Sequence, residues 1–209
     1  MLAALVCAAG LLAGCGGDDT ADGRPLVVTT VAPITSIVAN IVGDEAQVVG
    51  IVPEGTNSHT FEPRPSDAKQ LARADVIFMN GLRLEEPTRK LAEANKARGT
   101  EIVELGNETI TPDQYLYDFS FPKEEGKPNP HLWTNPLLVK RFAQIVAERM
   151  ARLDPDSAAT YRANLAAFSA RIDNFDAAIR TAFATIPAGQ RKLLTYHDAY
   201  AYFGKEYGF

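Results

Sequence analysis

Short β-branched runs alternate with helical periodicities over the first half of the chain. Continuous apolar runs are typical of strands that are buried on both faces of a sheet. Such runs lie at residues 26–30 and 46–52, and residues 75–80 and 101–105 are predicted to form a third and a fourth strand. Between and after them, apolar residues recur at spacings of three and four, which predicts helices at residues 34–42, 66–73 and 85–97, with Ser66 capping the second. Strands that alternate with helices favour an α/β fold built on a parallel sheet.

The middle of the chain is predicted to hold one long loop and one helix. Residues 106–130 show no sustained periodicity and contain four prolines, which indicates a loop. Asn135 and Pro136 are then expected to cap and open a helix that extends to Arg152. Proline suits the first helical position, where a backbone N–H has no intrahelical partner.

The most regular pattern lies between Asp156 and Ile186, where neither proline nor glycine interrupts the chain. Apolar residues recur there at spacings of three and four, at Tyr161, Leu165, Phe168, Ile172, Phe175, Ile179 and Phe183. A helix of about 30 residues would span roughly 45 Å. Such a helix either bridges two lobes or is an ordinary amphipathic core helix.

The last residues predict a strand at 192–196, with His197 at its end, and a helix at 198–207. One strand and one helix cannot form a sheet or bury a core. We therefore expect the chain to be a C-terminally incomplete version of a larger protein.

The first residues predict export and lipid anchoring. Residues 1–14 are uncharged and apolar but too short to span a bilayer, as in the core of a secretory signal. They lead into Leu-Ala-Gly-Cys15, which resembles a bacterial lipobox, so that residues 1–15 form a signal peptide with lipobox and Cys15 is lipidated. Residues 16–24 are polar and glycine-rich, typical of a flexible tether. An ordinary signal peptide with a chance cysteine is the alternative.

Composition narrows the possible partners and ligands. The formal net charge is −5 and no Lys/Arg cluster offers a phosphate-binding surface, which argues against nucleic acid as a partner. Of the two cysteines, Cys7 would leave with the signal peptide and Cys15 would be acylated. Cysteine is therefore not expected to be a metal ligand in the mature protein.

The chain has only three histidines, and each lies at a predicted boundary between elements. His59 follows the second strand, His131 precedes the helix that opens at Pro136, and His197 ends the last strand. Ligands of open parallel α/β sheets bind outside the carboxyl ends of the strands, and imidazole suits zinc and other divalent first-row ions. A zinc ion on three histidines with an open position could instead hydrolyse a substrate. A metal-independent surface lipoprotein or adhesin is a third possibility.

The residues around these histidines carry a family resemblance. The blocks are SHTFEPRPSDAKQLARADVIFMNG, NPHLWTNP and LLTYHDAYAYFGKEYGF. They resemble, in this order, blocks of the metal-specific solute-binding proteins of bacterial ABC importers, the TroA/ZnuA-like zinc and manganese family. The resemblance covers residues 25–209.

The resemblance implies two lobes of parallel sheet with flanking helices, joined by one long helix. In this chain the first lobe would be residues 25–154, the connecting helix 155–187 and the start of an incomplete second lobe 188–209. It also implies a monomer that is not an enzyme. This monomer would capture a divalent transition-metal ion in the periplasm, or on the outer face of the cytoplasmic membrane, and deliver the ion to an ABC import permease.

The resemblance further implies that His59, His131 and His197 each supply a nitrogen ligand, with an Asp or Glu beyond residue 209 as the fourth ligand. Glu62 is a candidate for orienting a histidine through a hydrogen bond. Three imidazoles and one carboxylate favour four-coordinate zinc, whereas manganese prefers more oxygen. Many zinc-specific relatives carry histidines in the loop before the second ligand, and residues 106–130 have none. Manganese therefore remains the alternative ion.

Overall fold

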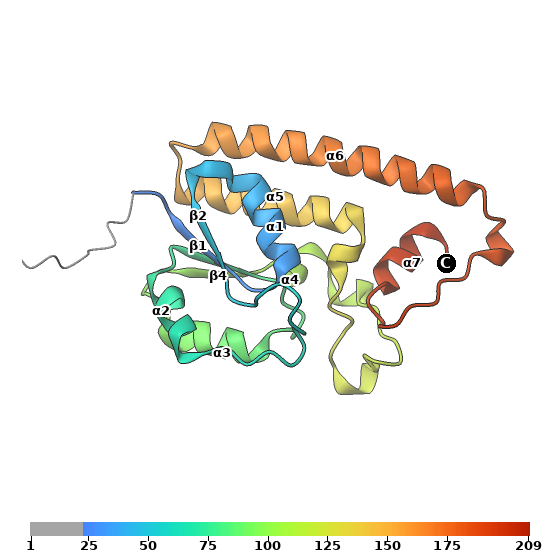
Figure 1. Cartoon of the computed structure of the whole chain (residues 1–209), viewed down its shortest axis with the longest axis horizontal. Helices are drawn as coiled ribbons and strands as arrows, with labels where there is room; N and C mark the ends of the chain where they lie inside the picture. Colours follow the sequence, from blue (N-terminus) through green and yellow to red (C-terminus); the bar gives the residue numbers. More distant parts are fainter. Residues whose placement is uncertain (1–22) are drawn as a thin grey trace, which may run out of the picture.

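A computed structural model describes residues 23–209 of the chain (Figure 1). The predicted signal peptide, the lipidation site at Cys15 and most of the predicted tether lie outside the described residues. Among the helices of the described part, none combines the length and the apolar character that crossing a membrane requires.

One parallel sheet organises the described residues. Its strands are β1 Leu26–Thr29, β2 Gln47–Gly50, β3 Val76–Met79 and β4 Glu101–Glu104, in the order β2-β1-β3-β4. All three neighbouring pairs are parallel, with Val28 opposite both Val49 and Ile77. The four strands lie within the predicted runs, and the α/β fold with a parallel sheet is confirmed.

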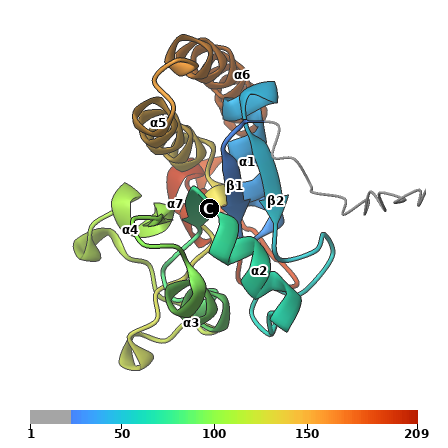
Figure 2. The same ribbon diagram turned by 90° about the vertical axis from the view of Figure 1, so that its left-hand side faces the viewer.

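The described chain forms seven α-helices. They are α1 Ala32–Val42, α2 Pro65–Arg73, α3 Glu86–Asn95, α4 Leu105–Thr109, α5 Pro136–Leu153, α6 Ala158–Ala184 and α7 Ala201–Tyr207. Short 3₁₀ turns lie at Gly43–Glu45, Pro112–Gln114, Lys123–Glu125, Leu132–Thr134 and Ala188–Gln190. Figure 2 shows α5 and α6 on one side of the sheet and α2 and α3 on the other.

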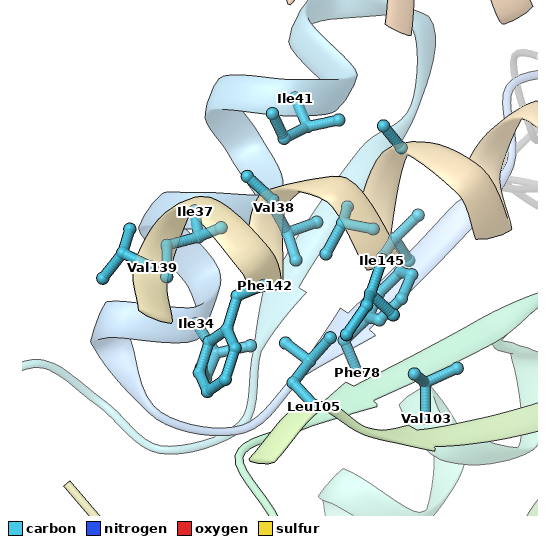
Figure 3. Close-up of a cluster of buried hydrophobic side chains, with 14 of the residues drawn as sticks. Ile34, Ile37, Val38, Ile41, Phe78, Val103, Leu105, Val139, Phe142 and Ile145 are labelled. Carbon is cyan, nitrogen blue, oxygen red and sulfur yellow. The ribbon is translucent and has the colours of Figure 1, made fainter. Parts of the chain in front are cut away.

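The sheet buries apolar side chains on both faces because successive strand residues point to opposite sides. Phe78 and Val103 point to the face covered by α1 and α5, where they meet Ile34, Val38 and Phe142 (Figure 3). Val28 and Ile77 point to the other face and pack with Leu71 of α2 and Ala92 of α3. Burial on both faces explains why the central strand β3, Val-Ile-Phe-Met, is apolar throughout.

The predicted long helix is confirmed as α6, which runs without a break for 27 residues, or about 40 Å. Its first half packs on α1 and α5 and buries Tyr161 and Phe168. Further along, Phe175 is 58% exposed, and Phe183 packs edge-on against Phe209 after α7. The division of the chain into two lobes stays a prediction.

Four local predictions were wrong in whole or in part. The predicted loop at residues 106–130 contains most of helix α4 and two 3₁₀ turns. Residues 192–196 form no strand, and Leu194 is 98% exposed, because no described strand lies beside this segment to pair with it. Helix α7 begins at Ala201 rather than at residue 198. Ser66 does not cap α2: Pro65 is the first helical residue, and the Asp67 carboxylate accepts the backbone N–H of Arg64.

A buried carboxylate, Glu85, fills the crevice between β1 and β3. The connections of these two strands leave on opposite faces of the sheet, and such a point is where open α/β sheets usually bind ligands. The Glu85 carboxylate accepts hydrogen bonds from the Thr30 hydroxyl at 2.6 Å and from the backbone N–H groups of Asn80 at 2.7 Å and Gly81 at 3.1 Å. Burial raises the pKa of Glu85 to about 7. The Asn80 side chain then donates to the carbonyl of Pro130, beside His131.

This raised pKa predicts how the stability of a Glu85→Gln variant depends on pH. The folded protein binds more protons than the unfolded chain between the ordinary carboxyl pKa and about 7, so the contribution of Glu85 to the free energy of unfolding falls as pH rises through that window. Gln does not titrate. We therefore expect the destabilisation caused by Glu85→Gln to shrink by on the order of 2 kcal/mol from pH 5 to pH 8, measured by urea unfolding.

The exposed Glu54→Gln serves as the matched control for this measurement. A destabilisation by Glu85→Gln that stays constant or grows with pH contradicts the prediction.

Candidate metal centre

The three histidines come together from three distant segments. His59 lies in the loop after β2, His131 lies immediately before the 3₁₀ turn that leads into α5, and His197 lies between α6 and α7. Their ligand atoms all lie within 4.8 Å of one another. The Nε2 atom of His131 is 3.1 Å from that of His59 and 3.0 Å from that of His197.

These separations are suited to one small cation. Zinc–nitrogen bonds of about 2.0–2.1 Å at tetrahedral angles place ligand nitrogens about 3.3–3.4 Å apart. The two Nε2 separations from His131 are within a few tenths of an ångström of that value. The cluster can therefore supply three nitrogen ligands to one divalent ion with little rearrangement of the rings.

An asparagine two residues before each of the first two histidines shapes the local backbone. The side-chain oxygen of Asn57 accepts the backbone N–H of His59, and that of Asn129 accepts the backbone N–H of His131, each at 3.0 Å. These are Asx turns, in which a side chain replaces a backbone acceptor. Both histidines are thus presented on the same local motif, Asn-x-His.

Asn129 also fixes the tautomer of His131. Its side-chain oxygen lies 2.8 Å from His131 Nδ1. Because this oxygen is held toward His131 by the backbone N–H, it accepts a hydrogen bond from Nδ1, which must carry the proton. Nε2 is then left with a lone pair that faces the other two rings, which is the form that binds a metal.

The surroundings favour the neutral form of two of the three rings, those of His131 and His59. His131 is 3% exposed, and burial, followed by the charges of His59 and His197, lowers its pKa to about 3. His59 is more exposed; loss of water beside the cluster and the charge of His197 lower its pKa as well. Trp133 packs edge-on against His131 with ring centroids 5.0 Å apart, and Phe121 lies 5.6 Å from His59.

A cavity of about 540 Å³ opens beside the three rings. The loop residues Thr56, Asn57 and Ser58 line one part of it, and Tyr196 and Tyr200 line another. An ion bound to the three imidazoles would face this space, which has room for a further oxygen ligand from a carboxylate or water.

The structure places the predicted site residues as follows. It brings His59, His131 and His197 together, and it leaves Glu62 exposed in the segment that leads to α2. Sequence reasoning missed Asn129, which contacts a histidine ring directly. The repeated Asn-x-His spacing at residues 57–59 and 129–131 is the signal that could have found it.

Comparisons with known proteins identify the family of the chain. The sequence profile of the family described as "Zinc-uptake complex component A periplasmic" matches residues 27–209. The chain is 34% identical to "Zinc-binding protein TroA" of Treponema pallidum, over all of this chain and 67% of that protein. It is also 34% identical to "Manganese-binding lipoprotein MntA" of Halalkalibacterium halodurans, over 95% of this chain and 64% of that protein.

The solved structure of the periplasmic zinc-binding protein TroA from Treponema pallidum superposes with a TM-score of 0.79 at 31% identity, over 90% of this chain and 65% of that one. The chain thus spans about two thirds of the length of the relatives it matches. The profile match and the overall likeness confirm the resemblance seen in the sequence. This chain belongs to the ZnuA/TroA family of metal-binding substrate-binding proteins of ABC transporters.

Proposed function

We propose that this chain captures one divalent transition-metal ion outside the cytoplasm, through His59, His131 and His197, and delivers it to an ABC import permease. The observation that carries the proposal is the convergence of three imidazole nitrogens, two pairs of them 3.0–3.1 Å apart, around a buried His131 whose neutral form is favoured. The family is one of solute-binding proteins rather than enzymes, so capture and release is the activity we assign.

Within this proposal we favour zinc over manganese. Three neutral imidazoles suit a four-coordinate zinc ion, whereas manganese takes more oxygen ligands. The relatives are named for both ions. Sites with nitrogen ligands bind zinc more tightly than manganese as a rule, so affinity alone does not identify the transported ion. The number of ligands around the bound ion is the more informative property.

The three ligands differ in how firmly the fold holds them. His131 is buried and held by Asn129, whereas His59 and His197 lie in exposed segments. We propose that the ion bonds first to the fixed nitrogen of His131 and then to the rings of His59 and His197. The predicted lipid on Cys15 would keep this monomeric protein on the outer face of the membrane, where the permease receives the ion.

Single substitutions of the histidines test the ligand assignment. We expect His59→Ala, His131→Ala and His197→Ala each to weaken zinc binding by roughly 100-fold or more, since losing a ligand costs more than the 10–100-fold effect of losing an outer hydrogen-bond partner. Isothermal titration with a competing chelator measures the change.

Glu62→Ala is the companion variant. Because Glu62 is exposed, we expect its removal to change zinc affinity by no more than about twofold. Wild-type affinity in all three histidine variants would remove this site from consideration.

The pH dependence of zinc affinity tests whether the cluster is shielded from protons. For an imidazole with the ordinary pKa of about 6.5, the neutral fraction falls roughly 30-fold between pH 7.5 and pH 5. A site of three independent imidazoles would therefore lose about 10⁴-fold in zinc affinity. The lowered pKa of His131 keeps this ring neutral throughout the range, and the lowered pKa of His59 reduces the loss of affinity that protonation of His59 causes. We therefore expect zinc affinity to fall as pH falls, by about 10³-fold or less.

Circular dichroism at each pH verifies that the protein stays folded during this titration. A flat profile would show that the imidazoles are not ligands, and a loss near 10⁴-fold would show that the cluster is not shielded.

A further inference from the structure

Asn129 is a completely buried side chain at which the segments of two histidines meet. On its oxygen side it accepts the backbone N–H of His131 at 3.0 Å and the Nδ1–H of the same residue at 2.8 Å. On its nitrogen side it donates to a carboxylate oxygen of Asp118 and to the backbone carbonyl of Asp198, both at 2.6 Å. Asp198 directly follows His197, so one carboxamide touches the immediate surroundings of two rings of the cluster.

The orientation of this carboxamide follows from its partners. A backbone N–H only donates, which requires the oxygen of Asn129 to face His131. A backbone carbonyl only accepts, which requires the nitrogen of Asn129 to face Asp198. All four hydrogen-bonding positions of the side chain are therefore used, and turning the amide over would leave buried groups without partners.

Two further hydrogen bonds fasten the same segment. The Ser120 hydroxyl donates to the Asp198 carboxylate at 2.5 Å. The Thr134 hydroxyl lies 3.1 Å from the carbonyl of Ala199 and 2.8 Å from that of His131. Residues 198–199 are thus tied to both sides of His131, and Figure 1 shows the segment before α7 running back to the loop that precedes α5.

We propose that Asn129 is a positioning residue shared by two metal ligands: it selects the nitrogen of His131 that faces the ion and holds the segment carrying His197 beside it. Asp118 and Ser120 support this arrangement through their hydrogen bonds to Asn129 and Asp198, and we call the three residues Asn129, Asp118 and Ser120 the clamp. The inference rests on the proposed function, because it takes His131 and His197 as ligands. Its consequence is that His197 is placed before the ion arrives, so that less chain has to be ordered on binding.

Asn129→Asp separates the two roles. The new carboxylate keeps an oxygen for the Nδ1–H of His131, but its second oxygen replaces the amide nitrogen and faces the oxygens of Asp118 and Asp198. At pH 8, well above the ordinary imidazole pKa, we expect His131 to keep its tautomer while zinc affinity falls roughly 10–100-fold, as is usual when an outer partner of a metal ligand is lost. In Asn129→Ala the acceptor is lost too, and we expect a mixture of His131 tautomers.

The readouts are zinc affinity and the imidazole ¹⁵N spectrum of the metal-free protein, which reports the protonated nitrogen of each ring. Asn95→Asp is the matched control, because Asn95 is a half-buried asparagine on α3 whose amide also donates to a backbone carbonyl, that of Leu91. Ser120→Ala removes one hydrogen bond of the clamp at an exposed position, so folding should be unaffected. We expect zinc affinity to fall two- to tenfold, roughly the contribution of one hydrogen bond.

The proposal is supported if Asn129→Asp loses affinity with the His131 tautomer retained while Asn95→Asp behaves as wild type. It is overturned if Asn129→Asp binds zinc as wild type does, or if Nε2 of His131 carries the proton in the metal-free wild type. Should Asn129→Asp not fold, Ser120→Ala decides: reduced affinity supports the clamp and unchanged affinity overturns it. A wild-type chain that binds neither zinc nor manganese would defeat the proposed function instead, while the ¹⁵N spectrum would still test the role of Asn129 at His131.

Discussion

Three imidazole rings whose ligand atoms lie within 4.8 Å of one another cannot easily all be protonated, because their positive charges would repel. The environment of His131 meets this constraint. Burial lowers the pKa of His131, and its ring partner is the carboxamide of Asn129 rather than a carboxylate, which would stabilise the charged imidazolium. What results at His131 is a neutral nitrogen base whose Nε2 lone pair faces the other two rings. A divalent cation supplies the positive charge that such a base lacks.

The sheet provides the foundation for this cluster. Its carboxyl edge is closed by the buried Glu85, which accepts three hydrogen bonds from the ends of β1 and β3. The Asn80 side chain donates a hydrogen bond to the carbonyl of Pro130, the residue directly before His131. Immediately afterwards the chain enters α5, whose apolar face is part of the main core. The most deeply buried histidine is therefore attached on both sides to buried parts of the fold.

The sequence predicted those features that depend on local patterns. The strand runs around Val28 and Ile77 and the uninterrupted stripe of α6 carry their periodicity within a few residues, and both were found where expected. Residues 192–196 have strand-forming side chains, but a strand also needs a neighbour, and none of the described strands is placed to pair with them. The site was predicted from family-like blocks around each histidine rather than from spacing. The contact of Asn129 with Asp198 joins residues 69 positions apart, so no local pattern reports it.

The most direct test of the three-imidazole site is X-ray absorption at the zinc edge on the zinc-loaded chain. Our interpretation predicts three imidazole ligands at about 2.0–2.1 Å in a four-coordinate shell completed by one oxygen. A shell with fewer than three imidazoles, or one composed mainly of oxygen at higher coordination number, would contradict it.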